Sequence, residues 1–451
     1  MRRRRLLAVS GALLAGAVAG CTENDSEGPS EDSESSDPDP VADRAPATAL
    51  AALDDDQLQE LVGETNGFAV DLHRRLLADR ADENIFSSPI SASIALGMTY
   101  AGASGNTREQ MRSTLRYTVD DLHETMGELQ RRLDERGASD GEADGEDNGD
   151  EEEDTPFQLS IANSVWGQQD YPFADDYRTT LAQQYGAELA EANFRGDPSG
   201  ERARINSWVA DETEGTIEEL LPPGSIDDLT RLVLVNAIYF LANWEQPFPE
   251  DRTEQATFTA LDGTDHEVPL MGLKRAWSYV EREGTRAVEL PYVGGDAAML
   301  VVLPPEGEFE AYEREFDGDQ LAELVDGLDT QEGTVRLPRF EFDTSVQLSD
   351  PLKQLGMLDA FDKERADFTG MAESGEGEGL YLMEAYHDAA VAVDEAGTEA
   401  AAATGAVIGD TSAPVDPFEF VADRPFLFAI RDRPTGAVLF LGRVVDPSGW
   451  E

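Results

Sequence analysis

Lysine is nearly absent from this chain, which carries only Lys274, Lys353 and Lys363 among its 451 residues. Arginine supplies the rest of the positive charge, yet Lys and Arg number 34 against 93 Asp and Glu, a formal net charge of −59. Such self-repulsion strains a folded domain in dilute buffer, but molar salt shortens the screening length to about 3 Å. The charge favours a halophilic protein, or an acidic one that awaits a basic partner. It argues against nucleic-acid binding, because phosphates would be repelled.

Cysteine and histidine are also scarce. Cys21 is the single cysteine, so the chain cannot form an internal disulfide. The four histidines are His73, His123, His266 and His387, and no pair of them has the spacing of zinc ligands. No glycine-rich phosphate loop is present either. We therefore expect no metal, no cofactor and no metal-dependent hydrolase.

Residues 1–20 have the pattern of a signal peptide: a basic head, Arg2 to Arg5, precedes an apolar stretch too short to span a bilayer with ease. Val18-Ala19-Gly20-Cys21 resembles a lipoprotein processing box in which Cys21 becomes lipidated, and the consecutive arginines resemble a twin-arginine signal. A buried structural cysteine is the alternative, but nothing foldable surrounds Cys21. We expect the protein in the extracellular space or lipid-anchored on the outer face of the cytoplasmic membrane.

Composition divides the remaining chain into a tether and a folded domain. Residues 21–51 consist largely of Ser, Asp, Glu and Pro with almost no large apolar residue, so they cannot offset the entropy of ordering. We expect a disordered acidic tether there and one folded domain over residues 52–451. An acidic, glycine-rich insert at residues 137–155 interrupts this domain.

The acidic insert contains a near-match to a calcium-binding loop. Asp140, Glu142, Asp144, Gly145 and Glu151 fall close to the required spacing, with Glu142 where Asp or Asn is usual. However, no clear helix follows to pair with the one before it. A solvated loop is the preferred interpretation, and calcium binding stays the alternative.

Apolar periodicity predicts both helices and strands in the folded domain. Helical spacing covers Asp55 to Ala78, Ser91 to Tyr100, and one or two helices between Arg108 and Arg136. Strand-like segments include Ala298 to Leu303, Thr334 to Phe342, Phe426 to Ile430 and Ala437 to Val444. Strands and helices do not alternate regularly, so the fold class is α+β.

Residues 394–412 form an unusual segment of small side chains without proline or aromatic residues. Alternate positions from Thr398 to Ile408 are small or apolar and uncharged, as a strand face turned to a core requires. The absence of proline leaves every N–H available to a sheet. An alanine-rich helix or a flexible surface loop fits the composition as well. The pattern by itself leaves these three structures open.

Several stretches in a common order resemble the serpin family, from about Gln57 to Pro447. They are Asn84 to Ser91, Leu234 to Phe240 followed by Trp244 and Phe248, Leu290 to Tyr292, Ala366 to Met371, Glu395 to Ala402, and Arg424 to Phe428. Each match is weak alone, but their shared order is specific. Together with the processing box and the charge, the chain resembles a haloarchaeal-type lipoprotein form of the family.

The resemblance implies the serpin fold, with three β-sheets, about nine helices and an exposed reactive-centre loop. It implies a monomeric serine protease inhibitor, not an enzyme. A target protease cleaves the loop and forms an acyl-enzyme. The cleaved loop then inserts into the main sheet of a metastable native state and traps the covalent complex before deacylation.

The resemblance also assigns roles to residues. The loop hinge comprises Glu395, Gly397, Thr398, Glu399, Ala400, Ala401, Ala402 and Ala403. The reactive bond joins Thr411 and Ser412. A polar cluster under the main sheet, the shutter, comprises Ser88, Ser91, Asn236 and His387, and the breach at the top of the sheet comprises Trp244, Arg339 and Glu395. Threonine before the reactive bond favours subtilisin-like or elastase-like targets over trypsin-like ones, which need a cation there.

Two other functions stay open at this point. A non-inhibitory serpin-fold protein could serve binding, storage or chaperone roles, but such proteins typically carry bulky, charged or proline residues in the hinge, and Ala400 to Thr404 has none. A lipid-anchored solute-binding protein would fit the anchor and the tether but not the serpin-like stretches.

Overall fold

The computed structural model describes residues 55–138, 157–187, 189–213, 215–373, 379–383, 385–398 and 417–448. Cys21 and the expected signal and tether lie outside this range. Glu399 to Ala403, Thr411 and Ser412 also lie outside it, as does most of the acidic insert.

The described residues contain nine α-helices: α1 (Asp55–Leu76), α2 (Pro89–Tyr100), α3 (Gly105–Thr114), α4 (Leu122–Ala138), α5 (Asp175–Tyr185), α6 (Pro198–Glu212), α7 (Phe309–Glu315), α8 (Gly318–Asp326) and α9 (Ser349–Leu355). Short 3-10 helices lie at Leu77–Asp79, Glu250–Arg252, Asp359–Phe361 and Thr369–Met371. The periodicity between Arg108 and Arg136 belongs to two helices, α3 and α4. The helix α2 is buried along its whole length, and the Ser88 side chain caps its first turn.

Fifteen strands are described: β1 (Ile85–Ser87), β2 (Phe157–Gln168), β3 (Leu189–Ala192), β4 (Leu232–Asn243), β5 (Glu254–Thr259), β6 (Asp265–Arg282), β7 (Thr285–Pro291), β8 (Ala297–Leu303), β9 (Asp329–Pro338), β10 (Phe340–Gln347), β11 (Tyr386–Val393), β12 (Gly397–Thr398), β13 (Phe418–Val421), β14 (Phe426–Asp432) and β15 (Val438–Val444). The expected α+β class is therefore confirmed.

Six strands form the main sheet, in the order β10-β11-β12-β4-β2-β3. The other nine strands are hydrogen-bonded into one sheet because the long strand β6 takes part in two groups of strands. Along its first part β6 pairs with β5 and β9, and β9 pairs with β13. Its last residues pair with β7, which continues through β8, β14 and β15 to β1. These two groups and the main sheet make up the three sheets of the expected fold.

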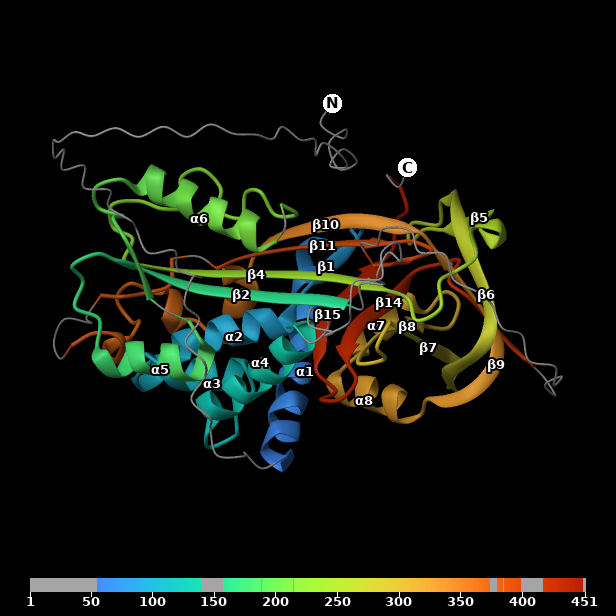
Figure 1. The fold of residues 1–451 in the computed structure, drawn as a ribbon, viewed down its shortest axis with the longest axis horizontal. Coiled ribbons are helices and arrows are strands. Elements are labelled where there is room, and N and C mark those ends of the chain that lie inside the picture. The colour runs from blue at the N-terminus through green and yellow to red at the C-terminus, as the bar shows by residue number, and fades with distance from the viewer. Residues whose placement is uncertain are drawn as a thin grey trace, which may run out of the picture. The chain divides into compact units, whose positions relative to one another are not determined.

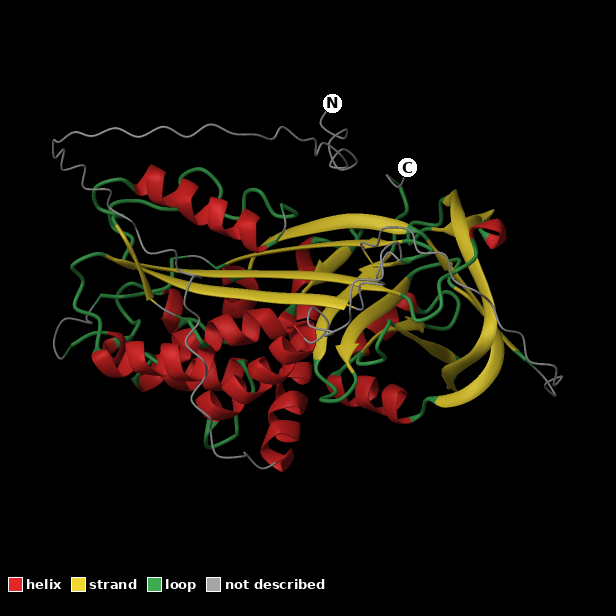
Figure 2. Cartoon of the chain, viewed as in Figure 1, coloured by secondary structure: helices red, strands yellow, loops and turns green. Residues whose placement is uncertain are grey.

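The main sheet is covered unequally on its two sides (Figure 1). The helix α6 lies along one side of β2 and β4, whereas α2, α4 and α5 lie on the other side, where helices gather (Figure 2). Trp166 of β2 and Val235 of β4 pack against Ile205 and Val209 of α6 in a small apolar cluster. A larger core between the sheets and the remaining helices includes Phe68, Phe86 and Phe428. The main sheet is thus the element on which the expected hinge and shutter meet.

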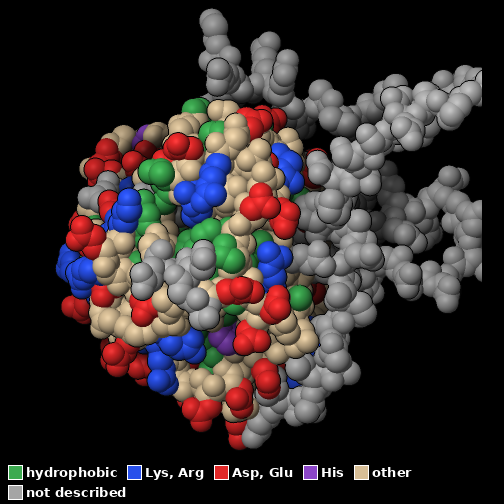
Figure 3. Space-filling view, turned by 90° about the vertical axis from the view of Figure 1, so that its left-hand side faces the viewer, with side chains coloured by type: hydrophobic (Ala, Val, Ile, Leu, Met, Phe, Trp, Pro, Cys, Tyr) green, Lys and Arg blue, Asp and Glu red, His purple; other side chains and the backbone are tan. Residues whose placement is uncertain are grey.

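Arginine neutralises every buried carboxylate among the described residues. The buried acids and their partners are Glu128 with Arg131 and Arg132, Glu289 with Arg431 and Arg433, Glu313 with Arg443, Asp359 with Arg365, Glu395 with Arg339, and Asp432 with Arg136. The planar guanidinium suits such pairs better than an ammonium group does. Figure 3 shows other acidic side chains on the surface, interspersed with basic side chains over one end of the molecule.

Within the described part of the chain, no helix has the length and apolar character needed to cross a membrane. The same residues include no group of three or more His, Cys, Asp or Glu side chains placed to hold a metal ion.

Candidate functional site

Two residues of the predicted hinge, Gly397 and Thr398, belong to the main sheet. Gly397 and Thr398 form β12, which lies between β11 and β4. Thr398 is opposite Val393 of β11 on one side and Ala242 of β4 on the other, and Gly397 is opposite Asn243. Both pairings are antiparallel. Of the residues predicted to form the hinge, Gly397 and Thr398 thus form a two-residue strand between β11 and β4.

Gly397 fits there because it has no side chain. A Cβ atom at this position would lie 2.0 Å from the carbonyl oxygen of Ala242 and 2.7 Å from the Cα atom of Asn243. Both atoms belong to the backbone of β4, so neither can move aside without displacing the strand. Close approach of two backbones explains glycine at this hinge position.

A tight turn at residues 394–397 connects β11 to β12. The Asp394 carboxylate accepts hydrogen bonds from the backbone N–H groups of Ala396 (2.8 Å) and Gly397 (3.1 Å). The Trp244 indole N–H donates to the Asp394 carbonyl (2.9 Å), and its backbone N–H donates to the Ala396 carbonyl (2.7 Å). The Phe248 N–H donates to the Glu395 carbonyl (2.8 Å). Trp244 and Phe248, which follow β4, thus fix the position of the turn by hydrogen bonds to its carbonyl groups.

Glu395, which is buried, links this turn to Arg339, a half-exposed residue between β9 and β10. Its carboxylate accepts Arg339 Nη2–H at 2.6 Å and Nε–H at 2.5 Å, and it also accepts the Thr253 hydroxyl. Burial acts to raise the pKa of Glu395, but the hydrogen bonds from Arg339 and Thr253 outweigh it, so the pKa lies below its usual value. Glu395 is therefore ionised at neutral pH and anchors the base of the loop.

Thr398 points into the core. It is 2% exposed, and its hydroxyl lies 2.8 Å from the Tyr292 hydroxyl. The Tyr292 ring stacks on Trp244 with a centroid separation of 4.6 Å. Burial raises the pKa of Tyr292, and the hydrogen bond with Thr398 opposes that rise only in part. Position 398 thus admits a small side chain with one hydroxyl.

The four shutter residues form one hydrogen-bond network beneath the sheet. The Ser88 N–H donates to His387 Nε2 (2.9 Å), and His387 Nδ1 lies 3.2 Å from Asn236 Oδ1. The Asn236 amide donates to the Ser91 carbonyl (2.7 Å) and to the Ser91 hydroxyl. The Ser88 hydroxyl donates to the Leu439 carbonyl (2.7 Å). The network therefore ties α2 and β15 to β4 and β11.

His387 is neutral within this network. It is fully buried, and burial lowers its pKa from the ordinary 6.5 to about 4. Because Nε2 accepts from Ser88, the ring proton resides on Nδ1 and is donated to Asn236 Oδ1. Protonation of Nε2 would place two donors, the Ser88 N–H and the new N–H, against each other.

We expect His387 to make the fold sensitive to acid. In the unfolded chain the imidazole binds a proton near pH 6.5, whereas the folded chain binds it only near pH 4. This contribution to stability is therefore complete above pH 6.5 and is lost as the pH falls from about 6.5 to about 4, at up to about 1.4 kcal/mol per pH unit. Denaturant unfolding at a series of pH values, at constant salt, measures it.

The His387→Gln variant isolates this contribution, because glutamine can accept from Ser88 and donate to Asn236 without titrating. Subtracting its stability curve from that of the wild type cancels the other titrating groups. The difference in the free energy of unfolding between wild type and variant should become smaller as the pH is lowered from about 7 to about 5, because only the wild type loses the His387 contribution. Parallel curves across this range would contradict the assignment.

Sequence reasoning missed four residues of this site. Asn163 of β2 accepts from the Asn236 amide (2.6 Å) and extends the shutter network to a third strand of the sheet. Thr253, Tyr292 and Asp394 complete the anchoring of the hinge. The serpin-like stretches include Tyr292, but no pattern assigned it a role. The other three are common polar residues whose proximity depends on the fold.

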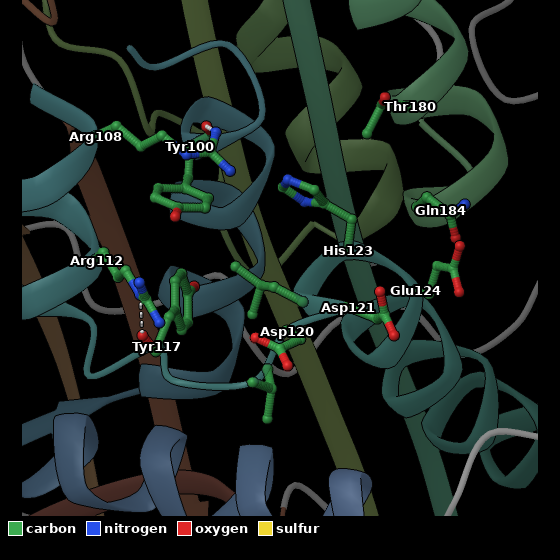
Figure 4. A pocket seen from close by; sticks show the side chains of 12 residues that line it. Tyr100, Arg108, Arg112, Tyr117, Asp120, Asp121, His123, Glu124, Thr180 and Gln184 are labelled. Carbon is green, nitrogen blue, oxygen red and sulfur yellow. Dashed lines mark hydrogen bonds between the residues drawn. The ribbon is translucent and has the colours of Figure 1, made fainter. Parts of the chain in front are cut away.

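A separate hollow of about 460 Å³ lies away from the hinge, among α2, α3, α4 and α5 (Figure 4). Tyr100, Tyr117 and His123 line it, and the His123 Nδ1 atom lies 2.7 Å from the Tyr185 hydroxyl. Arg108 and Arg112 border it but already donate to backbone carbonyls of the adjoining turns. None of the described residues of the expected hinge, shutter or breach lines this hollow.

Comparison with known proteins places this hinge and sheet in context. A family model described as "Serpin (serine protease inhibitor)" matches residues 63–447. The chain is 34% identical over 450 residues to an uncharacterized serpin-like protein of Thermococcus kodakarensis, covering 99% of each. It is 35% identical over 401 residues to the human leukocyte elastase inhibitor, covering 86% of this chain and 100% of that protein.

Solved structures agree with these sequence matches. The native-state structure of the thermophilic serpin tengpin superposes with a TM-score of 0.75 at 28% identity, covering 88% of this chain and 96% of the other. The similarity therefore spans the described sheets and helices and includes the region of the hinge.

Proposed function

Since the chain belongs to the serpin family, we propose that it is a suicide-type inhibitor of serine proteases. In this proposal a protease cleaves the reactive bond, Thr411–Ser412, in the segment that follows β12, and forms an acyl-enzyme. The cleaved segment then extends β12 between β11 and β4, which must separate, and the attached protease is carried with it before it can deacylate. The serpin similarity to proteins described as protease inhibitors supports a non-enzymatic role.

The observation that carries the proposal is β12 itself. Two hinge residues already occupy a strand position between β11 and β4, with antiparallel pairing on both sides. A strand that continues from there needs no new register. Continuing both pairings brings Thr404 opposite His387 on β11 and Asn236 on β4. Insertion must then separate the His387–Asn236 hydrogen bond, and a threonine hydroxyl is suited to bonding with both freed groups.

The residues that would follow β12 suit this path. Thr398, Ala400, Ala402, Thr404 and Ala406 alternate along one face, and none is charged or larger than threonine. The opposite positions on β11 that face the core are His387, Ala389, Val391 and Val393, all of which are buried. A bulky residue on the inserting face would have to displace these side chains, whereas alanine and threonine would not.

The target class follows from the reactive bond that the family resemblance suggests, Thr411–Ser412. Threonine offers no cation to an acidic specificity pocket, so trypsin-like proteases are unfavoured. Subtilisin-like or elastase-like proteases, with uncharged primary pockets, fit better. The relatives that are named leukocyte elastase inhibitors support this choice.

We also propose that the inhibitor acts outside the cell. The signal-like residues 1–20 and the processing box ending in Cys21 support export and lipid attachment, and the net charge of −59 supports a halophilic setting. The acidic residues 21–51 would then hold a monomeric inhibitor away from the membrane surface. Loss of membrane association in a Cys21→Ser variant, measured by fractionation, would support the anchor.

Incubation with a subtilisin-type and an elastase-type protease at high salt tests the inhibition. We expect an SDS-resistant adduct of inhibitor and protease, because an ester bond joins the protease serine to the new carboxyl end at Thr411. The mass of the released C-terminal fragment should correspond to Ser412–Glu451. A protease whose serine has been blocked beforehand is the control and should give no adduct.

Cleavage of the loop without any adduct, for every protease tried, would contradict inhibition and favour a non-inhibitory serpin. A fragment that begins at a residue other than Ser412 would correct the reactive bond without affecting the mechanism.

A further inference from the structure

Asp394 begins the turn that connects β11 to β12, and it is bonded to the end of that turn twice. Its backbone N–H donates to the Gly397 carbonyl (3.0 Å). Its carboxylate oxygen Oδ1 accepts the N–H groups of Ala396 (2.8 Å) and Gly397 (3.1 Å). A bond from an aspartate side chain to the N–H two residues later is an Asx turn. Both the backbone and the side chain of Asp394 therefore fix the length of the turn.

The length of this turn determines which residue of β12 lies opposite which residue of the neighbouring strands. In a hairpin the turn sets the register, and a shift of one residue turns every side chain to the other face of the sheet. With residues 394–397 in the turn, Thr398 is opposite Val393 of β11, and Gly397 is opposite Asn243 of β4.

Only glycine fits at the position that Gly397 occupies beside β4, because a Cβ atom there would lie 2.0 Å from the Ala242 carbonyl oxygen. A turn shorter by one residue would bring Ala396 to this position, and a turn longer by one residue would bring Thr398. Both of these residues carry a Cβ atom. Either shift would also turn the Thr398 hydroxyl away from Tyr292. The observed register is therefore the one of the three that β4 can accept.

We propose that Asp394 is a positioning residue that sets the register in which the strand enters the main sheet. This inference rests on the proposed inhibitory function and adds one residue to it. By binding two N–H groups of the turn, the Asp394 carboxylate keeps Gly397 opposite Asn243 before any cleavage takes place. A strand that extends from β12 then starts in the register that β4 accepts. Asp394 takes no part in the attack on the reactive bond.

Loss of this carboxylate should divert the reaction from inhibition to simple cleavage. Two backbone hydrogen bonds correspond to a change of roughly tenfold in the population of the ordered turn. Without them the turn adopts other lengths, and a strand that starts out of register meets the backbone of β4 at Ala242 and must withdraw. Each failed start delays insertion, and hydrolysis of the acyl-enzyme competes with insertion during the delay.

Two substitutions separate the geometry of the Asp394 side chain from its charge. Asp394→Asn removes the charge but keeps an oxygen at the same distance from the backbone, so it should still accept from both N–H groups. Asp394→Glu keeps the charge but adds a methylene group, and the longer side chain does not close the same turn. The comparison is needed because the pKa of Arg339 is raised by its hydrogen bond with Glu395 and, to a smaller extent, by the charge of Asp394.

The test measures the moles of full-length inhibitor consumed per mole of subtilisin-type protease inactivated, at high salt. Asp394→Ala and Asp394→Glu should raise this ratio by roughly threefold to tenfold, whereas Asp394→Asn should stay within about twofold of the wild type. Thermolysin, a metalloprotease that forms no acyl-enzyme, should cut the loop at the same rate in the wild type and in every variant. That rate reports access to the loop and not insertion, and mass spectrometry verifies the cut.

Asp262 provides a matched control in another hairpin. Its carboxylate accepts the Thr264 N–H (2.8 Å) in the turn between β5 and β6, which belong to the nine-stranded sheet. Asp262→Ala therefore also removes an aspartate that caps a turn, yet it should leave the ratio at the wild-type value. Denaturant unfolding of each uncleaved variant shows whether it is folded, and Asp394→Ala and Asp394→Glu test the role of the side chain independently.

Folded Asp394→Ala and Asp394→Glu variants that trap protease at the wild-type ratio would overturn the role of Asp394 and leave the inhibitory function intact. A rise in Asp394→Asn as large as that in Asp394→Ala would do the same, because the charge and not the turn would then matter. A wild type that forms no adduct with any protease would refute this inference together with the inhibitory function on which it rests.

Discussion

Thr398→Arg is expected to abolish the SDS-resistant adduct while leaving the loop a good substrate. Thr398 is 2% exposed and lies between β4 and β11 against Tyr292. An arginine there must bury its guanidinium to let the strand form, and burying an unpaired charge costs several kcal/mol. Every 1.4 kcal/mol added to the insertion barrier slows insertion about tenfold, so deacylation overtakes it. The moles of inhibitor consumed per mole of protease inactivated should therefore rise by more than about tenfold.

Thr398→Val is the matched control, because it keeps the size and shape of threonine and loses only the hydrogen bond to Tyr292. That loss is worth about 1 kcal/mol, so adduct formation should persist with a modest change in stoichiometry. Unfolding of the uncleaved Thr398→Arg protein must also be measured, since a misfolded variant would give the same loss of adduct. A folded Thr398→Arg variant that still traps protease stoichiometrically would show that the sheet can take up the strand with an arginine at position 398.

The helices and most strands could be predicted from the sequence because buried apolar residues recur in it at the spacing of a helix or a strand. The apolar spacing of Asp55 to Ala78 corresponds to α1, and that of Ser91 to Tyr100 to α2. The strand-like C-terminal pair corresponds to β14 and β15. In each case the side chains that face the core differ strongly from those that face water, and this contrast is what periodicity detects.

The hinge segment could not be resolved in the same way. Small residues suit a strand, a helix and a loop alike, so the pattern of residues 394–412 left all three open. What fixes Gly397 and Thr398 as a strand is the backbone of β4 beside them, together with the turn held by Asp394 and Trp244. The contacts with β4 and Trp244 join residues about 150 positions apart. No local pattern reports them.

The candidate site also contains residues that could be predicted from the sequence and residues that could not. The resemblance brought Ser88, Ser91, Asn236 and His387 together, and the structure places them in one network. It also placed Glu395 beside Arg339. Asn163 and Thr253 were not predicted because neutral polar residues in a strand or turn are common. The register of β2 against β4 brings Asn163 to Asn236, and the fold brings Thr253, which precedes β5, to Glu395.

Cleavage of the loop is expected to raise the thermal stability of the protein by an amount on the order of 10 to 20 °C. If β12 extends from Gly397 toward Thr411, the new strand gains backbone hydrogen bonds to both β11 and β4. At about 1 kcal/mol net for each bond, the extended ladder contributes on the order of 10 kcal/mol. A chain of this size loses enough entropy on folding that 1 kcal/mol corresponds to between about 1 and 2 °C. Calorimetry of the thermolysin-cut and uncut proteins measures the difference.

Peptide-bond hydrolysis by itself cannot explain such a gain, because a nick ordinarily relaxes a constraint on the chain and lowers stability. A nick introduced into the acidic insert, between α4 and β2, therefore serves as the control and should leave the unfolding temperature unchanged or lower it. Thr398→Arg cut in the loop should gain little, since its strand cannot pass position 398. An unchanged unfolding temperature in the loop-cut wild type would mean that β11 and β4 do not separate to accept the strand. The protease would then have nothing to carry it away from the reactive bond.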